Sequence, residues 1–398
     1  MNAQPEKSAG RVRLVRGREQ ILLAGYLWVY AGHIEAVAGD PAPGDVVDVC
    51  AHSGRAIGRG FFNPHSKIRV RLLTSRDEPL DDAFWTNRLR SACALRRRVV
   101  SDTNAYRLIH GESDFLPGLI VDRYGDMLVM QTLSFGMDRR KERLADLLMK
   151  ETGATAVYLR NDANSRTLEG LPVEQGFLRG SGATSIDIHE GRARFLADIE
   201  HGQKTGWFCD QRENRLAAAS LAAGAAVLEA FCHTGAFGIH AALHGASSVL
   251  GLDVSHDAVA MAREHAARNT VDERCSYREA DAFEELRRLE QAGRRFDLVI
   301  LDPPSFARTR LAVPQALAGY KQLNLRALRL LKPEGFLVSC SCSHHVSEEQ
   351  FWSMLQDAAR DAKRPLRLTE RRSQARDHPV LAAMPETRYL KCFIVQVL

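Results

Sequence analysis

The chain has few of the features that mark secreted, membrane or metal-binding proteins. Its eight cysteines include no CxxC pair, which argues against a disulfide framework or a cysteine zinc site. No apolar run approaches the roughly 18 residues that a membrane helix needs, and the polar start MNAQPEKSAG lacks the apolar stretch of a signal peptide. We therefore expect a cytoplasmic protein with reduced thiols, no metal and no membrane partner.

The composition is that of an ordinary globular protein. With 398 residues, of which 45% are hydrophobic and 26% charged, the chain has room for several domains and is not disordered or collagen-like. The net charge of +5 is unevenly spread: Lys and Arg against Asp and Glu number 16 to 10 in residues 1–100, 23 to 30 in 101–300 and 15 to 9 in 301–398. Basic ends suit a polyanion such as RNA, although like-charge clusters are more often solvated helix faces.

Changes in hydrophobic periodicity divide the chain into three parts. Residues 12–73 hold short β-branched segments between turns, which predicts a small all-β module. Residues 81–160 mix a helical pattern with strand-like stretches, as a compact α+β module does. From residue 226 onward strands and helices alternate, which predicts an α/β fold with a mostly parallel sheet and helices on both faces. We place the domains at 1–76, 77–188 and 189–398.

The candidate site residues follow the strands of the last part, because ligands of such sheets bind at the carboxyl ends of the strands. The first expected strand, 226–231, runs into the turn FCHTGAFG, with Phe231, His233, Thr234 and Gly235. Its glycines let a backbone approach a ligand, and the next helix offers N-terminal amides. The turn lacks the GxGxxG spacing of nicotinamide dinucleotide sites, so a dehydrogenase is disfavoured.

Acids end the next two expected strands. Asp253 is placed to accept hydrogen bonds from ribose hydroxyls, with a cap for the next helix as the alternative. Asp281, followed by Ala282, would meet an adenine edge, and a cap is an equal alternative there. A glycine turn and two acids at three neighbouring strand ends predict an adenosine pocket.

The fourth and fifth strand ends carry candidate chemistry. In LDPPSF, two prolines hold the backbone extended and leave Asp302 facing a ligand. The fifth strand ends in SCSCSHH. We expect Cys340 to be a core residue, whereas Cys342 lies where the strand ends, beside the Asp302 loop, so that its thiol can reach a substrate.

Together these motifs resemble a known family over nearly the whole chain. FCHTGAFG, GLDVS, LDPPSF, GYKQLN and SCSHHVS, with HGQKTGWFCDQRENR, YRLIHGESDFLPGLIVDRYGD and HPVLAAMPETRYLK, are similar to the ribosomal large-subunit methyltransferase I family. The resemblance implies a PUA RNA-binding domain, a central α+β RNA-binding domain and a C-terminal class I (Rossmann-like) methyltransferase domain that uses S-adenosyl-L-methionine. It implies methylation of carbon 5 of a cytosine in 23S ribosomal RNA, and it suggests a homodimer.

The resemblance also implies catalytic roles. Carbon 5 of cytosine is not nucleophilic by itself, and a thiolate that adds to carbon 6 makes it so. Cys342 matches the family's nucleophile, and Asp302 would act near N3. Many RNA cytosine-5 methyltransferases have a second cysteine where this chain has Ser305, so the base that removes the carbon 5 proton stays unassigned.

The segment before the first strand of the last part matches a cofactor-covering segment of the family. By resemblance, Phe208 would pack on the adenosine or methionine part, and Gln211 and Arg212 would bind the methionine carboxylate, for which a guanidinium fork is suited. A purely structural role, holding the linker to the sheet, is about as good an interpretation for each residue singly.

Two other functions remain open from the sequence. Some relatives with a DPP loop methylate a guanine nitrogen, but they need no nucleophile, so Cys342 argues against this function. A catalytically silent RNA-binding scaffold is the second alternative, and the adenosine constellation opposes it.

Overall fold

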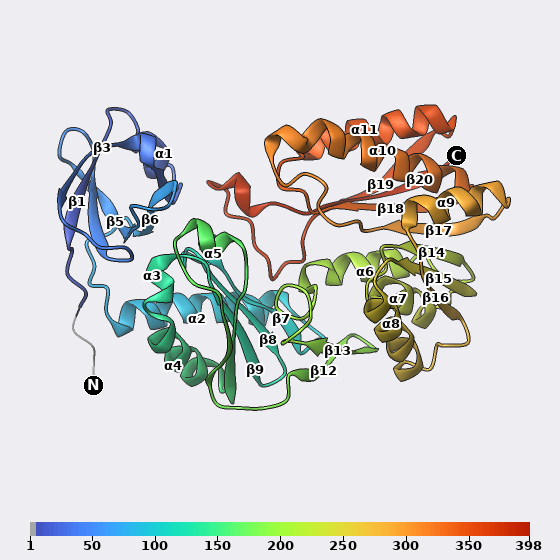
Figure 1. Ribbon diagram of the computed structural model, residues 1–398, viewed down its shortest axis with the longest axis horizontal. Coiled ribbons are helices and arrows are strands. Elements are labelled where there is room, and N and C mark those ends of the chain that lie inside the picture. Colours follow the sequence, from blue (N-terminus) through green and yellow to red (C-terminus); the bar gives the residue numbers. More distant parts are fainter. Residues whose placement is uncertain (1–4) are drawn as a thin grey trace. The chain divides into compact units, whose positions relative to one another are not determined.

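The computed structural model describes residues 5–398, which form two compact units (Figure 1). The first unit holds the chain up to Ile188 together with Leu196–Cys209 and Arg376–Thr387. The second holds His189–Phe195, Asp210–Ala375 and Arg388–Leu398. Each unit therefore combines segments that are far apart in the sequence.

The first unit begins with a six-stranded sheet in the order β2-β6-β5-β4-β1-β3. Its pairs are antiparallel except β1 with β4. Most of its apolar side chains form one core together with Met384, whereas Val46, Phe61 and Leu73 pack into the core of the second sheet. This confirms the small all-β module. The strands are β1 (Gly10–Leu14), β2 (Trp28–Tyr30), β3 (Ile34–Gly39), β4 (Val46–Cys50), β5 (Ala56–Phe62) and β6 (Ile68–Thr74), with the short helix α1 (Glu19–Leu23).

A second sheet of the first unit has the order β11-β10-β9-β8-β7. The helix α2 (Asp82–Val99) begins at Asp81, whose carboxylate accepts from the Phe84 amide at 3.0 Å, and it buries an apolar face in the same core as α4 (Lys141–Thr152). The strands are β7 (Ala105–His110), β8 (Leu119–Tyr124), β9 (Met127–Thr132), β10 (Ala156–Asn161) and β11 (Glu174–Arg179), with the short helices α3 (Phe135–Asp138) and α5 (Ser165–Leu168). A separate hairpin, β12 (Ser185–Glu190) and β13 (Ala193–Asp198), is divided between the units, because His189–Phe195 belong to the second.

The second unit is built on a seven-stranded sheet in the order β16-β15-β14-β17-β18-β20-β19. The first five strands run parallel, and β20 and β19 pair antiparallel at the end. The strands are β14 (Ala226–Ala230), β15 (Ser248–Asp253), β16 (Cys275–Glu279), β17 (Phe296–Leu301), β18 (Leu331–Ser341), β19 (Leu366–Arg372) and β20 (Lys391–Val397). The predicted mostly parallel sheet is confirmed.

Helices cover both faces of this sheet, as the strand-helix alternation predicts (Figure 1). One face carries α9 (Ala282–Gln291), α10 (Val313–Leu330) and α11 (Glu348–Ala362), and the other carries α6 (Arg212–Ala219), α7 (Ala236–Leu243) and α8 (His256–Arg268). Central strands such as β17, FDLVIL, are apolar almost throughout because both of their faces are buried.

The chain order reverses between β14 and β17, since β14 pairs with β15 on one side and β17 on the other. In open parallel sheets, ligands bind in the crevice outside the carboxyl ends of the strands at such a point. The loops after β14 and β17 are therefore the place to look for a site.

Candidate active site

The turn after β14 is held in an uncommon backbone conformation. Phe231 and His233 have φ angles of 62° and 48°, in the left-handed region that costs a non-glycine residue roughly 1 kcal/mol or more. Gly235, the N-cap of α7, has φ 79°, and a Cβ there would lie 2.7 Å from the Tyr277 hydroxyl. Glycine is thus required here because Tyr277 approaches closely. The residues before it shape the turn, whose Thr234 carbonyl accepts from His265 Nδ1 at 3.0 Å.

Glu229 is a buried acid beneath this turn that the sequence analysis did not single out. It is 2% exposed in β14, and its Oε2 accepts from the Gly238 amide at 2.9 Å. Burial raises the pKa of Glu229 to about 8, although amide hydrogen bonds from Gly238 and Phe237 oppose this, and the charge of Asp302 raises it further. The signal that could have identified it is its place as a lone acid within the apolar strand AVLEA.

The raised pKa of Glu229 predicts how stability depends on pH. Because its folded-state pKa of about 8 lies above the ordinary 4.5, the stability that the protonated form contributes is complete below about pH 4.5 and is lost as pH rises through about 8. Glu229→Gln keeps an acceptor for the Gly238 amide without a charge to bury. We expect it to match the original protein near pH 4 and to be more stable near pH 9 by on the order of 5 kcal/mol.

Denaturant unfolding of both proteins across this pH range measures the difference, with the exposed Glu273→Gln as a matched control. A stability gap between Glu229→Gln and the original protein that stays constant with pH would contradict the raised pKa.

Asp253, at the end of β15, holds the turn rather than capping the next helix. Its Oδ2 accepts from the His233 amide at 2.8 Å and its Oδ1 from the Ser255 amide at 3.0 Å. The side chain that caps α8 is Ser255, which accepts from the Ala258 amide at 3.3 Å, so the capping alternative for Asp253 is wrong. The carboxylate is half-buried, and each oxygen keeps a lone pair for a further donor.

Asp281 does act as a helix cap. Its Oδ1 accepts from the Glu284 amide at 3.0 Å at the start of α9, and the residue is exposed. Ala282, the first residue of α9, is 4% exposed. The capping alternative for Asp281 therefore describes its local structure, and contact of this pair with a cofactor stays a prediction.

The loop after β17 is fixed by hydroxyl groups. Ser305 Oγ lies 3.0 Å from Ser343 Oγ, which also lies 2.9 Å from the Tyr320 hydroxyl. Ser341 donates to the same Tyr320 hydroxyl at 3.0 Å. Asp302 is half-buried at the beginning of this loop. The loop that carries Asp302 and the end of β18 are thus tied together through α10.

The two cysteines at the end of β18 differ in exposure. Cys340 is fully buried, and a hydrogen bond with Cys392 together with burial raises its pKa well above the usual range. Cys342, just past the last strand residue, is half-buried. The expectation that Cys340 belongs to the core is confirmed, and Cys342 is the more accessible thiol.

Side-chain alternation explains the difference between serines and cysteines in SCSCS. In a strand, successive side chains point to opposite faces. Ser339 donates to Asn324 of α10 at 2.7 Å, and Ser341 donates to Tyr320 of the same helix. Cys340 must then face the opposite side of the sheet. There the larger effects of Cys392 and burial raise the pKa of Cys340, the charge of Asp302 raises it further, and a hydrogen bond from Gln211 opposes them.

The predicted cofactor-covering residues fall into two groups. Gln211, the last residue of a 3-10 turn (Cys209–Gln211), and Arg212, the first residue of α6, are both buried in the second unit. Gln211 Oε1 accepts from Asn214 at 2.7 Å. Phe208 belongs to the first unit, where Lys204 Nζ lies 4.5 Å from its ring centroid. Their contact with a cofactor stays a prediction.

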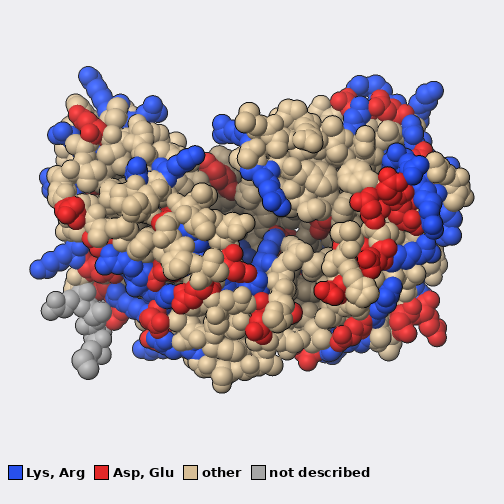
Figure 2. Space-filling view, in the orientation of Figure 1, with Lys and Arg blue, Asp and Glu red and all other residues tan. Residues whose placement is uncertain are grey.

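The basic residues of the first unit are not one open surface. Arg96 is 1% exposed and pairs with Asp114 at 2.5 Å, and Arg71 pairs with Glu112 at 3.0 Å. On the face that Figure 2 shows, Lys and Arg lie interspersed with Asp and Glu. Arg97 and Arg98 are exposed, so only part of the positive charge of residues 1–100 is available to a polyanion.

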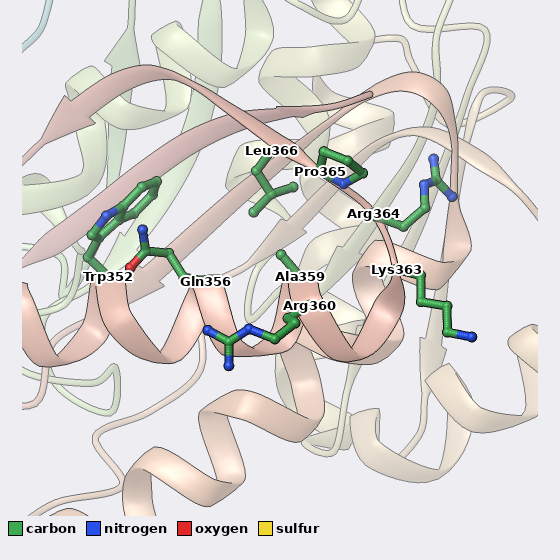
Figure 3. Close-up of a pocket in the computed structure, with 8 residues that line it drawn as sticks. All are labelled: Trp352, Gln356, Ala359, Arg360, Lys363, Arg364, Pro365 and Leu366. Carbon is green, nitrogen blue, oxygen red and sulfur yellow. The ribbon is translucent and has the colours of Figure 1, made fainter.

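A hollow of about 490 Å³ lies away from the strand carboxyl ends. It is bounded by α11 and the start of β19, where Leu366 pairs with Val397 near the amino end of β18. In Figure 3, the charged ends of Arg360 and Lys363 extend away from the apolar side chain of Leu366. Its lining residues are Trp352, Gln356, Ala359, Arg360, Lys363, Arg364, Pro365 and Leu366.

No group of three or more His, Cys, Asp and Glu side chains in residues 5–398 is placed to hold a metal ion. No helix in the same range combines the length and the apolar character that crossing a membrane requires.

The hydrogen-bond acceptors and donors at this site fit an adenosine-containing cofactor. Asp253 offers carboxylate lone pairs to a ribose diol at the end of the strand next to the turn. The turn itself presents strained backbone beside the switch point. Buried Gln211 and Arg212 supply amide and guanidinium donors at the start of α6, which suit a carboxylate.

Comparison with known families and proteins gives consistent matches. Residues 12–75 match the model of a PUA-like domain, and residues 172–391 match that of an S-adenosylmethionine-dependent methyltransferase. The chain is 41% identical to ribosomal RNA large subunit methyltransferase I of Shewanella denitrificans, over 97% of this chain and 99% of that protein. It is 38% identical to the protein of the same name from Alteromonas mediterranea, over 98% and 99%.

Solved structures agree in fold. A structure described as a methyltransferase complexed with SAH superposes with a TM-score of 0.85 at 20% identity, covering 97% of this chain and 100% of the other. A SAM-dependent methyltransferase from Streptococcus mutans gives a TM-score of 0.83, also at 20% identity and with the same coverage.

Proposed function

Because the chain belongs to the ribosomal RNA large subunit methyltransferase I family, we propose that it methylates carbon 5 of a cytosine in 23S ribosomal RNA through a covalent adduct with Cys342. One observation carries the cytosine assignment. Of the two cysteines at the end of β18, Cys340 is sealed in the core, whereas Cys342 is half-buried at the carboxyl edge of the sheet. A methyltransferase that acts on a nitrogen needs no such thiol.

The cofactor S-adenosylmethionine supplies an electrophilic methyl group. Asp253 would accept from its ribose hydroxyls, while Gln211 and Arg212 would bind its carboxylate. Phe231, His233, Thr234 and Gly235 would line the cofactor from the turn, Asp281 and Ala282 would lie near the adenine, and Phe208 would pack against it. Asp302 would border both the cofactor and the base.

Cys342 and Asp302 divide the covalent chemistry. The Cys342 sulfur bonds to carbon 6 of the cytosine, the electrons of the 5,6 double bond form a 4,5 double bond, and those of the 3,4 double bond move to N3, which Asp302 hydrogen-bonds or protonates. Carbon 5 would then bond to the methyl group as the bond between that group and the cofactor sulfur breaks, which leaves S-adenosylhomocysteine, and the 3,4 double bond re-forms. A base removes the carbon 5 proton, the 5,6 double bond re-forms, the bond from sulfur to carbon 6 breaks to release Cys342 as a thiolate, and any proton taken up at N3 returns to Asp302.

The domains before the catalytic one would hold the RNA. Exposed cations such as Arg97 and Arg98 would contact phosphates, which gives salt-sensitive affinity without base specificity, and the target cytosine would leave its stack to reach Cys342. We propose domain limits of 1–76 for the PUA domain, 77–188 for the central RNA-binding domain and 189–398 for the methyltransferase domain. Cytoplasmic location and a homodimer remain predictions.

Identification of the modified base tests this function. The protein is incubated with unmodified 23S ribosomal RNA and S-adenosylmethionine labelled in the methyl group, the RNA is digested, and the labelled nucleoside is identified. We expect 5-methylcytidine. A labelled methylguanosine would replace the cytosine assignment, and no measurable S-adenosylmethionine binding would favour the silent scaffold.

A further inference from the structure

Lys391 is a buried lysine beside the end of β18. It begins β20, opposite Ser341 in the antiparallel pair of β18 and β20, and is 4% exposed. Its ammonium donates to the Ser343 carbonyl at 2.6 Å and to the Tyr389 carbonyl at 2.9 Å. The cation is therefore held at the residue that follows Cys342.

No carboxylate neutralises this cation within ion-pair distance in the part of the chain from residue 5 to 398. The acid whose charge acts on it, Glu348, is itself paired with Arg371 at 3.2 Å and with Arg388. A buried ammonium without a counter-ion is costly. Burial accordingly lowers the pKa of Lys391 to about 8, and the first effect that opposes this is negative charge on Cys342.

We propose that Lys391 is a positioning residue whose ammonium favours the thiolate form of Cys342 and, through Ser343, fixes the loop that carries it. The proposal rests on the function proposed above. A cation near a cysteine stabilises the thiolate, which is the reactive species. The sulfur gives up its negative charge when its bond to carbon 6 forms and regains it when that bond breaks, so the same ammonium stabilises both the attacking and the leaving thiolate.

Other charged or titratable groups act near this pair from the surrounding elements. Burial raises the pKa of Tyr320 in α10, and negative charge on Cys342 raises it further. Glu348 of α11 and Arg388 before β20 act on Lys391 through their charges, and Asp302 after β17 acts on Cys340, two residues before Cys342, so the test variants leave these groups and Tyr320 unchanged.

The experiment measures alkylation of Cys342 by iodoacetamide as a function of pH in the full chain, with the Cys342 peptide quantified by mass spectrometry. We expect half-maximal reactivity of the original protein below the pH of about 8.5 typical of a cysteine. Lys391→Met should move this midpoint up by about one unit and slow alkylation near pH 7 about 10-fold. Lys391→Arg, which keeps the charge, should restore most of the difference. Lys332→Met, which removes an exposed lysine of β18, should leave the pH dependence of Cys342 alkylation unchanged.

Several outcomes would overturn the role of Lys391. They are a midpoint at or above about 8.5 in the original protein, or an unchanged pH profile in a folded Lys391→Met variant that still binds S-adenosylhomocysteine. If Lys391→Met does not fold, the profiles of the original protein and of Lys391→Arg decide. Retained methyl transfer by Cys342→Ala would instead refute the proposed function, so the two failures are distinguishable.

Discussion

Cys342→Ala is expected to lower methyl transfer to 23S ribosomal RNA by at least about 10⁴-fold while S-adenosylhomocysteine binds within about 2-fold of its original affinity. Without the sulfur adduct, carbon 5 of the cytosine stays too poor a nucleophile to attack the methyl group. The half-buried side chain lies at the end of β18, so its truncation leaves the core intact. Single-turnover methylation with labelled cofactor measures the first quantity and calorimetric titration the second.

Cys275→Ala is the matched control for this variant. Cys275 is the other half-buried cysteine of the described chain and begins β16, at the amino end of the sheet. We expect this variant to retain full turnover. Methyl transfer by Cys342→Ala within about 10-fold of the original rate would show that Cys342 is not the nucleophile.

The same variant also tests the adduct directly. RNA in which 5-fluorocytosine replaces cytosine blocks the last step, because carbon 5 then carries no proton to remove. The original protein should form an RNA complex that survives denaturation, and Cys342→Ala should form none.

The sequence predicted those parts of the second unit that depend on local pattern. Strand-helix alternation from residue 226 onward gave the parallel strands and their helices because apolar periodicity is a property of neighbouring residues. The distinction between Cys340 and Cys342 was also visible, since one precedes the end of a strand and the other follows it.

Features that depend on distant partners were not visible in the sequence. The strands β19 and β20 were not predicted, and they pair with each other and with β18 across the C-terminal part of the chain. From the sequence alone, a lysine such as Lys391 is expected at the surface, but β20 places it beside Ser343. Arg96 lies in the basic first hundred residues, where like charges favour a solvated helix face, yet Asp114, on another element, pairs with it in the interior. Long-range pairing decides burial in each case.

Asp302→Asn is expected to lower methyl transfer by about 10²- to 10⁴-fold, the range of a lost acid catalyst, with the fluorocytosine adduct forming more slowly by a similar factor. Asparagine keeps the size of the side chain and a hydrogen-bond donor for N3, but it cannot transfer a proton. The variant therefore separates proton donation from mere contact. Asp302 is half-buried at the carboxyl end of β17, so little loss of stability is expected.

Asp297→Asn provides the control on the same strand. Asp297 lies at the amino end of β17, where its Oδ2 accepts from the Ala226 amide and from Lys332, both at 2.8 Å, so its variant should lose some stability and no chemistry. Unchanged turnover in Asp302→Asn would show that a hydrogen bond to N3 suffices or that a group other than Asp302 donates the proton. A loss of S-adenosylhomocysteine affinity equal to the loss of turnover would assign Asp302 to the cofactor alone, because removal of an acid that acts only on the base leaves cofactor binding intact.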